Sequence, residues 1–199
     1  MSLFVTFEGI DGSGKSTVSR RVHQELQHRG VKTILTIEPT KTQIGEFVNT
    51  CIRTNADPAL TAFAFIADRI QHCAQIREWL ADGAIVLCDR YAESTYAYQG
   101  AQLQGTMRSP IRWLQDLSKD RILIPERTFL FVIPPAAALA RIQQRPELIP
   151  FERQAFLERV HRNYLRLCTG PRFTRLDATQ PVETLVATCV KAILEEHEV

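Results

Sequence analysis

Near its N-terminus the chain contains Gly9-Ile10-Asp11-Gly12-Ser13-Gly14-Lys15-Ser16, which matches the phosphate-binding pattern GxxxxGK[ST]. The apolar run Leu3–Glu8 precedes this loop, and the amphipathic segment Val18–His28 follows it. A strand before the loop and a helix after it are the context that the pattern requires. Backbone N–H groups of such a loop point at phosphate oxygens, and the helix adds its positive N-terminal end. The stretch therefore predicts an ATP or GTP site, against the alternative of a glycine turn with a solvated lysine.

Apolar runs that predict buried strands recur along the chain, and amphipathic segments such as Ala62–Leu80 lie between them. Strands that alternate with helices favour an α/β fold, in which a parallel sheet carries helices on both faces. No repeat or Ser/Gly-rich linker interrupts the chain, so residues 1–199 are expected to form a single domain. The predicted strands are Leu3–Glu8, Thr33–Ile37, Ala84–Cys88, Thr128–Ile133 and, with a weaker pattern, Arg172–Leu176.

The composition argues against several classes of protein. A formal net charge of +2 is too small to suggest a nucleic-acid coat or a protein of the membrane surface. The N-terminus, MSLFVTFEG, has neither a basic flank nor a long apolar run, so no signal peptide and no membrane span are expected. Five cysteines occur singly, without a CxxC pair, which favours reduced thiols and a cytoplasmic location.

A carboxylate follows the third predicted strand. Ala84–Cys88 is apolar and Asp89 comes directly after it, as in a Walker B element. Asp89 would then hold Mg²⁺ together with the hydroxyl of Ser16. An aspartate at the end of a strand also caps turns, so that alternative stays open here.

The residues beyond Asp89 identify a family. Asp89–Tyr91 is followed by Ala92–Gly100, while Phe65–Arg69 and Glu38-Pro39 precede it. With the phosphate-binding loop, these segments resemble the thymidylate kinases, whose pattern includes DRY followed by SxxAYQG. The resemblance extends from about residue 4 to residue 181. It implies the three-layer P-loop kinase fold, with a five-stranded parallel sheet flanked by helices and a helical lid. It also implies ATP as phosphoryl donor, Mg²⁺, dTMP as acceptor and a homodimer.

The resemblance also implies roles on the acceptor side. Arg90 would clamp the acceptor phosphate, Arg69 would contact the base and the phosphate region, and Phe65 would stack on thymine. Asp11 would bind the deoxyribose 3′-hydroxyl and orient the acceptor phosphate. The physical chemistry agrees, since a guanidinium grips phosphate bidentately and a flat aromatic ring suits a base. The remaining pocket residues would be Glu38, Ser94, Thr95, Tyr98 and Gln99.

Purely structural explanations remain open for three of these residues. Phe65 lies at helical spacing with other apolar residues, so core packing alone would explain it. Tyr98 taken alone is equally a core residue. Arg69 would be a solvated helix residue if it merely paired with a nearby carboxylate.

On the donor side, the resemblance assigns catalysis to Lys15, Asp11 and Arg90. An arginine-rich segment, about residues 141–153, would add a mobile lid over ATP, because Gly12 and Ser13 place no arginine in the loop. Arg141 would stack on adenine or touch phosphate. Arg145 would reach the transferring group, with Arg153 as a substitute because Pro150 replaces the usual lid arginine. The alternative is a solvated, salt-bridged helix pair. The ATP-binding residues would be Gly9, Ile10, Asp11, Gly12, Ser13, Gly14, Lys15, Ser16, Thr17 and Arg141.

Two departures leave the acceptor open. Ile37 replaces the arginine of the usual REP, and Asn49 replaces an arginine that in many relatives touches the acceptor phosphate. The alternatives are therefore a kinase for another pyrimidine nucleotide, or a protein that binds ATP as a switch without an acceptor. A switch would need neither the arginine-bearing acceptor motifs nor a lid, which argues against the last of these.

Overall fold

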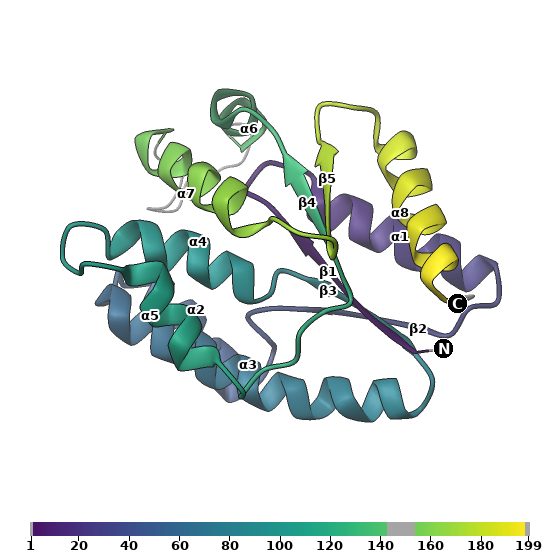
Figure 1. Ribbon diagram of the computed structural model, residues 1–199, viewed down its shortest axis with the longest axis horizontal. Helices are drawn as coiled ribbons and strands as arrows, with labels where there is room; N and C mark the ends of the chain where they lie inside the picture. The colour runs from purple at the N-terminus through teal and green to yellow at the C-terminus, as the bar shows by residue number, and fades with distance from the viewer. Residues whose placement is uncertain (1, 143–153, 198–199) are drawn as a thin grey trace.

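A computed structural model of the chain describes residues 2–142 and 154–197. Within them, strands and helices alternate along the sequence, and the helices cover both faces of one sheet (Figure 1). The strands are β1 (Leu3–Glu8), β2 (Thr33–Ile37), β3 (Ile85–Asp89), β4 (Arg127–Val132) and β5 (Phe173–Asp177). The helices are α1 (Lys15–His28), α2 (Gln43–Arg53), α3 (Pro58–Ala81), α4 (Ala92–Gln102), α5 (Pro110–Ser118), α6 (Pro135–Ile142), α7 (Gln154–Leu167) and α8 (Val182–His197).

The sheet has five parallel strands in the order β2-β3-β1-β4-β5. This confirms the predicted three-layer α/β architecture of a P-loop kinase. β1 is central, and Phe7 near its end pairs with Asp89 of β3 on one side and with Phe129 of β4 on the other. The chain leaves β1 into the phosphate-binding loop at the same edge where β3 ends on Asp89. In parallel sheets, ligands bind at this carboxyl edge.

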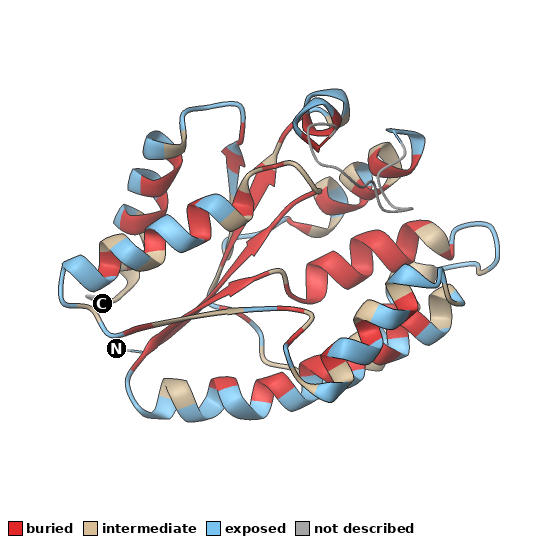
Figure 2. Cartoon of the chain, turned by 180° about the vertical axis from the view of Figure 1, so that it is seen from behind, coloured by how far each residue is buried: buried red, intermediate tan, exposed pale blue. Residues whose placement is uncertain are grey.

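Two apolar layers hold the sheet between the helices. Val5 and Phe7 of β1 face a large buried cluster that includes Val22 of α1 and Val190 of α8. Phe4 lies on the opposite face and packs in a second cluster with α3, α4 and α5. Successive strand residues point to opposite faces, so a strand buried on both sides needs an uninterrupted apolar run. Figure 2 shows this burial along the central strands of the sheet.

The predicted element ends are displaced by small amounts. The strands expected at Ala84–Cys88, Thr128–Ile133 and Arg172–Leu176 are each shifted by one residue, because the ladder of hydrogen bonds, not apolar character, sets their ends. Helix α3 begins at Pro58, earlier than the predicted Ala62. The Asp57 side chain there accepts hydrogen bonds from the first turn, and proline suits the first helical position.

None of the helices within residues 2–142 and 154–197 is long and apolar enough to cross a bilayer.

Candidate functional site

The phosphate-binding loop is packed tightly against α6. Gly12 has a φ of +80°, and a Cβ atom there would lie 2.3 Å from the carbonyl oxygen of Ala138. A side chain at this position would therefore collide with backbone, which explains why the loop carries glycine and no arginine.

Lys15 is the first residue of α1 and is buried. Burial lowers the pKa of Lys15 to about 8, and the positive charge of Arg90 acts in the same direction. Asp11 and Asp89 oppose the shift. The ammonium group is thus held in a desolvated place beside the loop, where the negative charge of a phosphate favours its protonated form.

The two predicted magnesium ligands lie in one pocket. Ser16 and Asp89 both line a cavity of about 440 Å³ at the ends of α1 and β3. Asp89 Oδ1 is buried and accepts no hydrogen bond from the described residues. A carboxylate oxygen and a hydroxyl oxygen are the hard ligands that Mg²⁺ prefers, and Mg²⁺ takes its remaining ligands from water and phosphate. The residues present therefore fit the ion.

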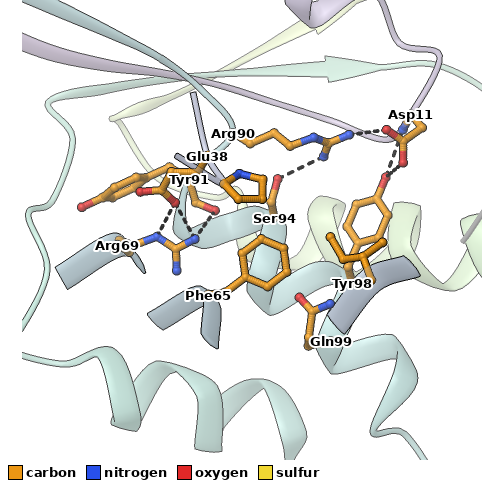
Figure 3. A pocket seen from close by; sticks show the side chains of 11 residues that line it. Asp11, Glu38, Phe65, Arg69, Arg90, Tyr91, Ser94, Tyr98 and Gln99 are labelled. Carbon is orange, nitrogen blue, oxygen red and sulfur yellow. Dashed lines mark hydrogen bonds and ion pairs between the residues drawn. The ribbon is translucent and has the colours of Figure 1, made fainter. Parts of the chain in front are cut away.

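A second cavity, of about 110 Å³, lies next to the loop and gathers residues from five parts of the chain (Figure 3). Asp11 comes from the loop, Glu38 from the end of β2, and Phe65 from α3. The Phe65 ring points into the space between the side chains of Arg69 and Tyr98 in this view. The lining residues are Asp11, Glu38, Pro39, Ile52, Phe65, Arg69, Arg90, Tyr91, Ser94, Tyr98 and Gln99.

One end of this cavity is formed by Arg90, Asp11 and Tyr98. Arg90 has a φ of +71°, an unusual conformation for a residue with a side chain, and its guanidinium is paired with the Asp11 carboxylate. The Tyr98 hydroxyl donates to Asp11 Oδ2 at 2.7 Å and accepts from the Asp11 amide at 3.0 Å. Burial alone would lower the pKa of Arg90, but Asp11, together with Tyr98, Tyr164 and Asp89, outweighs this effect, and the pKa is raised. The result is a fixed cation at the mouth of the loop.

The other end of the cavity holds a buried ion pair. Arg69 is fully buried, and its Nε donates to Glu38 Oε2 at 2.8 Å. Its Nη2 donates to the carbonyl of Tyr91 and to the hydroxyl of Thr95. Burial by itself would lower the pKa of Arg69, yet the Glu38 carboxylate holds it above its ordinary value. Nη1 finds no partner within the described part of the chain.

Glu8, which the sequence analysis did not single out, organises the turn between β3 and α4. Its buried carboxylate accepts from the amide of Tyr91 at 2.8 Å, and from the amide and hydroxyl of Ser94 at 3.1 and 2.6 Å. Tyr164 of α7 donates to it at 2.9 Å. Burial raises the pKa of Glu8, and the negative charge of Glu93 adds to the shift. The available signal was an acidic residue inside an apolar strand, directly before the loop.

A known protein family matches nearly the whole chain. A sequence model described as thymidylate kinase matches residues 7–189. The chain belongs to the thymidylate kinase family. A "Probable thymidylate kinase" from Methanosarcina barkeri is 38% identical over 195 residues, 96% of this chain and 95% of that protein. One from Methanoculleus marisnigri is 39% identical over 184 residues, 91% and 89% of the two chains. One from Natronomonas pharaonis is 35% identical over 195 residues, which are 96% of this chain and 97% of that protein.

The structure brings together most of the acceptor residues that the family pattern suggested. Thr95 does not line the cavity, although its hydroxyl accepts from Arg69. The alternative of a solvated Arg69 is wrong, because the side chain is buried against Glu38. Phe65 is only half-buried and borders the cavity, so it is not simply core. The predicted residues that line the cavity are Asp11, Glu38, Phe65, Arg69, Arg90, Ser94, Tyr98 and Gln99.

The donor-side residues are only partly described. Thr17 is exposed on α1, away from the buried Lys15. Arg141 donates to the carbonyl of Gly12 at 3.4 Å and to the carbonyl of Ala178 at 3.1 Å, so it joins the loop to the turn after β5. Arg145 and Arg153 lie outside the described residues, as does nearly all of the segment expected to form the lid. Their roles stay predictions.

Proposed function

We propose that this protein transfers the γ-phosphoryl group of ATP to dTMP, giving dTDP and ADP. Membership of the thymidylate kinase family supports this reaction. The observation that carries it is the cavity beside the loop, whose lining has the Arg90 cation at the loop end and two unpaired buried groups, on Arg69 and Gln99, that suit a base. Arg90 at the loop end lies where it would grip the acceptor phosphate bidentately.

Thymine would be recognised by the side chains that line the cavity on either side of Phe65 (Figure 3). Two buried atoms of these side chains have no hydrogen-bond partner among the residues that the structure describes: the Nη1 donor of Arg69 and the Oε1 acceptor of Gln99. A pyrimidine with a carbonyl at C4 and a proton on N3 satisfies such a pair. Cytosine presents an amino group and a bare nitrogen at the same positions, so it would leave both unsatisfied. Phe65 supplies an aromatic face for the ring.

Charged side chains around the loop would assist phosphoryl transfer. Lys15 would neutralise the transferring group, while Asp11 and Tyr98 hold Arg90 in position. Mg²⁺, bound by Ser16 and Asp89, would supply Lewis-acid neutralisation of the donor phosphates. Arg141 would contact ATP from α6. We also propose, as in the wider family pattern, that Arg145 and Arg153 contribute charge from the segment that closes over ATP.

The acceptor is tested by measuring ADP release from ATP with dTMP, dUMP, dCMP and UMP in parallel. We expect dTMP to have the highest kcat/KM and dCMP to fall at least about a hundredfold below it, since two buried groups would lose their partners. A preference for dCMP would contradict the proposed base contacts. ADP release that is independent of every acceptor would indicate an ATP-binding switch.

An apolar stripe supports the further proposal of a homodimer. Leu60, Phe63 and Ile70 are exposed along one side of α3, and Phe47 of α2 is exposed as well. Helices α2 and α3 pack against each other, so a second copy of the chain would cover both.

Light scattering at micromolar concentration should therefore give about twice the 22.6 kDa mass of the chain. The variant Phe63→Glu should shift the protein to the monomer mass, because a buried, unpaired charge opposes association. A wild-type monomer over the whole concentration range would contradict the proposal.

We also propose a domain organisation and a cellular location for the protein. Residues 1–199 are proposed to act as one kinase domain, with dTMP and ATP as its small-molecule partners. A cytoplasmic location stays a prediction, in keeping with five cysteines that are all buried and free of disulfides.

A further inference from the structure

Behind the acceptor cavity, four side chains form a continuous chain of hydrogen bonds. The hydroxyl of Thr36 lies 2.8 Å from His72 Nε2, and His72 Nδ1 lies 3.0 Å from Glu38 Oε1. The other Glu38 oxygen accepts from Arg69. His72, Glu38 and Arg69 are all buried. Of the four, only Glu38 and Arg69 border the cavity.

The sequence places these side chains together by simple spacing. Arg69 and His72 are three residues apart on α3, so they share one side of that helix. Thr36 and Glu38 are two residues apart on an extended segment and point to the same side. The Glu38 amide donates to the carbonyl of Asp89 at 3.2 Å, which continues the pairing of β2 with β3 past the last strand residue.

The direction of each hydrogen bond follows from its partners. A carboxylate only accepts hydrogen bonds, so Nδ1 of His72 carries the hydrogen and donates it in the hydrogen bond to Glu38. In that tautomer of the neutral ring Nε2 accepts, and the hydroxyl of Thr36 donates to it. The ring is also set edge-on against Trp79, with the ring centres 6.2 Å apart. His72 is therefore held from two sides and presents one N–H to Glu38.

This arrangement determines where Arg69 points. Its Nε and Nη2 are occupied by Glu38, Tyr91 and Thr95. In Figure 3 the third nitrogen, Nη1, points away from Glu38. The guanidinium is planar, so fixing the Glu38 carboxylate fixes the direction of Nη1 as well.

We propose that His72 is a positioning residue for acceptor recognition: it anchors Glu38 and thereby aims the free Arg69 donor at the C4 carbonyl of the pyrimidine. The inference rests on the proposed function, since it assumes that a pyrimidine nucleotide occupies the cavity. His72 is the informative residue to change. Replacing Arg69 or Glu38 alone would leave its buried ionic partner without compensation and would endanger the fold itself.

The test compares His72→Leu with His72→Asn. Leucine removes the N–H to Glu38, whereas the asparagine amide keeps a donor close to the position of Nδ1. For His72→Leu we expect the KM for dTMP to rise about tenfold and the preference for dTMP over dCMP to fall about tenfold, with kcat and the KM for ATP within about threefold of wild type. His72→Asn should restore most of both losses. Gln75→Ala, exposed one turn further along α3, serves as the matched control.

Thr36→Val provides a second, independent variant if His72→Leu fails to fold, and we expect a smaller change in the same direction. Wild-type KM and base preference in His72→Leu, or in Thr36→Val when only that variant folds, would overturn the inference. An equal loss of dTMP use, ATP use and thermal stability, not rescued by asparagine, would show that His72 is merely structural. A wild-type protein that phosphorylates none of the acceptors would overturn the proposed function itself. Normal wild-type activity with an unaffected His72→Leu overturns only the role of His72.

Discussion

Lys15→Ala is expected to lower kcat by about a thousandfold or more, because it removes the buried cation that the phosphate-binding loop itself supplies. The Lys15 side chain is buried, which also lowers its pKa, so water would not replace its effect on the transferring group. Steady-state turnover with saturating ATP and dTMP measures the loss.

Lys191→Ala is the matched control for this prediction. Lys191 is exposed on α8, far along the chain from the loop, and forms a long ion pair with Glu195 at 3.7 Å. Its removal should leave turnover unchanged. A Lys15→Ala protein that folds normally and turns over at the wild-type rate would refute the assignment of the loop to ATP.

The second large effect is expected for Arg90→Ala. This variant removes the cation that Asp11 holds at the mouth of the acceptor cavity. A charge-assisted bidentate contact with the acceptor phosphate would be lost, so kcat/KM for dTMP should fall about a thousandfold, or about 4 kcal/mol. Calorimetry should give an ATP affinity close to that of wild type.

Arg112→Ala provides the comparison for Arg90, since Arg112 is exposed on α5 and forms an ion pair with Asp116 on the same helix. It should behave as wild type in both measurements. If Arg90→Ala weakened ATP binding as much as dTMP use, the residue would be a structural part of the loop, because Arg90 also donates to the Gly9 carbonyl.

The fold followed from the sequence because the central strands β1, β3 and β4 are buried on both faces and are therefore mainly apolar, whereas the edge strands β2 and β5 are partly exposed. Local rules also placed Arg90 and Asp89 at one edge of the sheet. The roles of Glu8 and His72 could not be predicted from the sequence, and the reason is the same for both. Each acts through side chains brought in from distant segments, Glu8 through Tyr164 and His72 through Glu38. The local pattern shows an acidic residue in an apolar strand and a histidine on a helix, but it does not show the partners that give each residue its role.

Spacing could likewise not decide between a solvated and a buried Arg69. The helical pattern of α3 fixes which side the residue occupies, but Glu38 and the turn after β3 decide what covers that side. A distant contact likewise determines one residue of the phosphate-binding loop. Position 12 requires glycine because the backbone carbonyl of Ala138, more than a hundred residues away, leaves no room for a Cβ atom.

The central claim is that the γ-phosphoryl group of ATP passes to dTMP within this chain. The most direct measurement is ³¹P NMR of the purified protein with ATP, Mg²⁺ and dTMP. We expect the dTMP signal to decline while dTDP and ADP appear in equal amounts. Formation of ADP with inorganic phosphate, while dTMP stays unchanged, would contradict it.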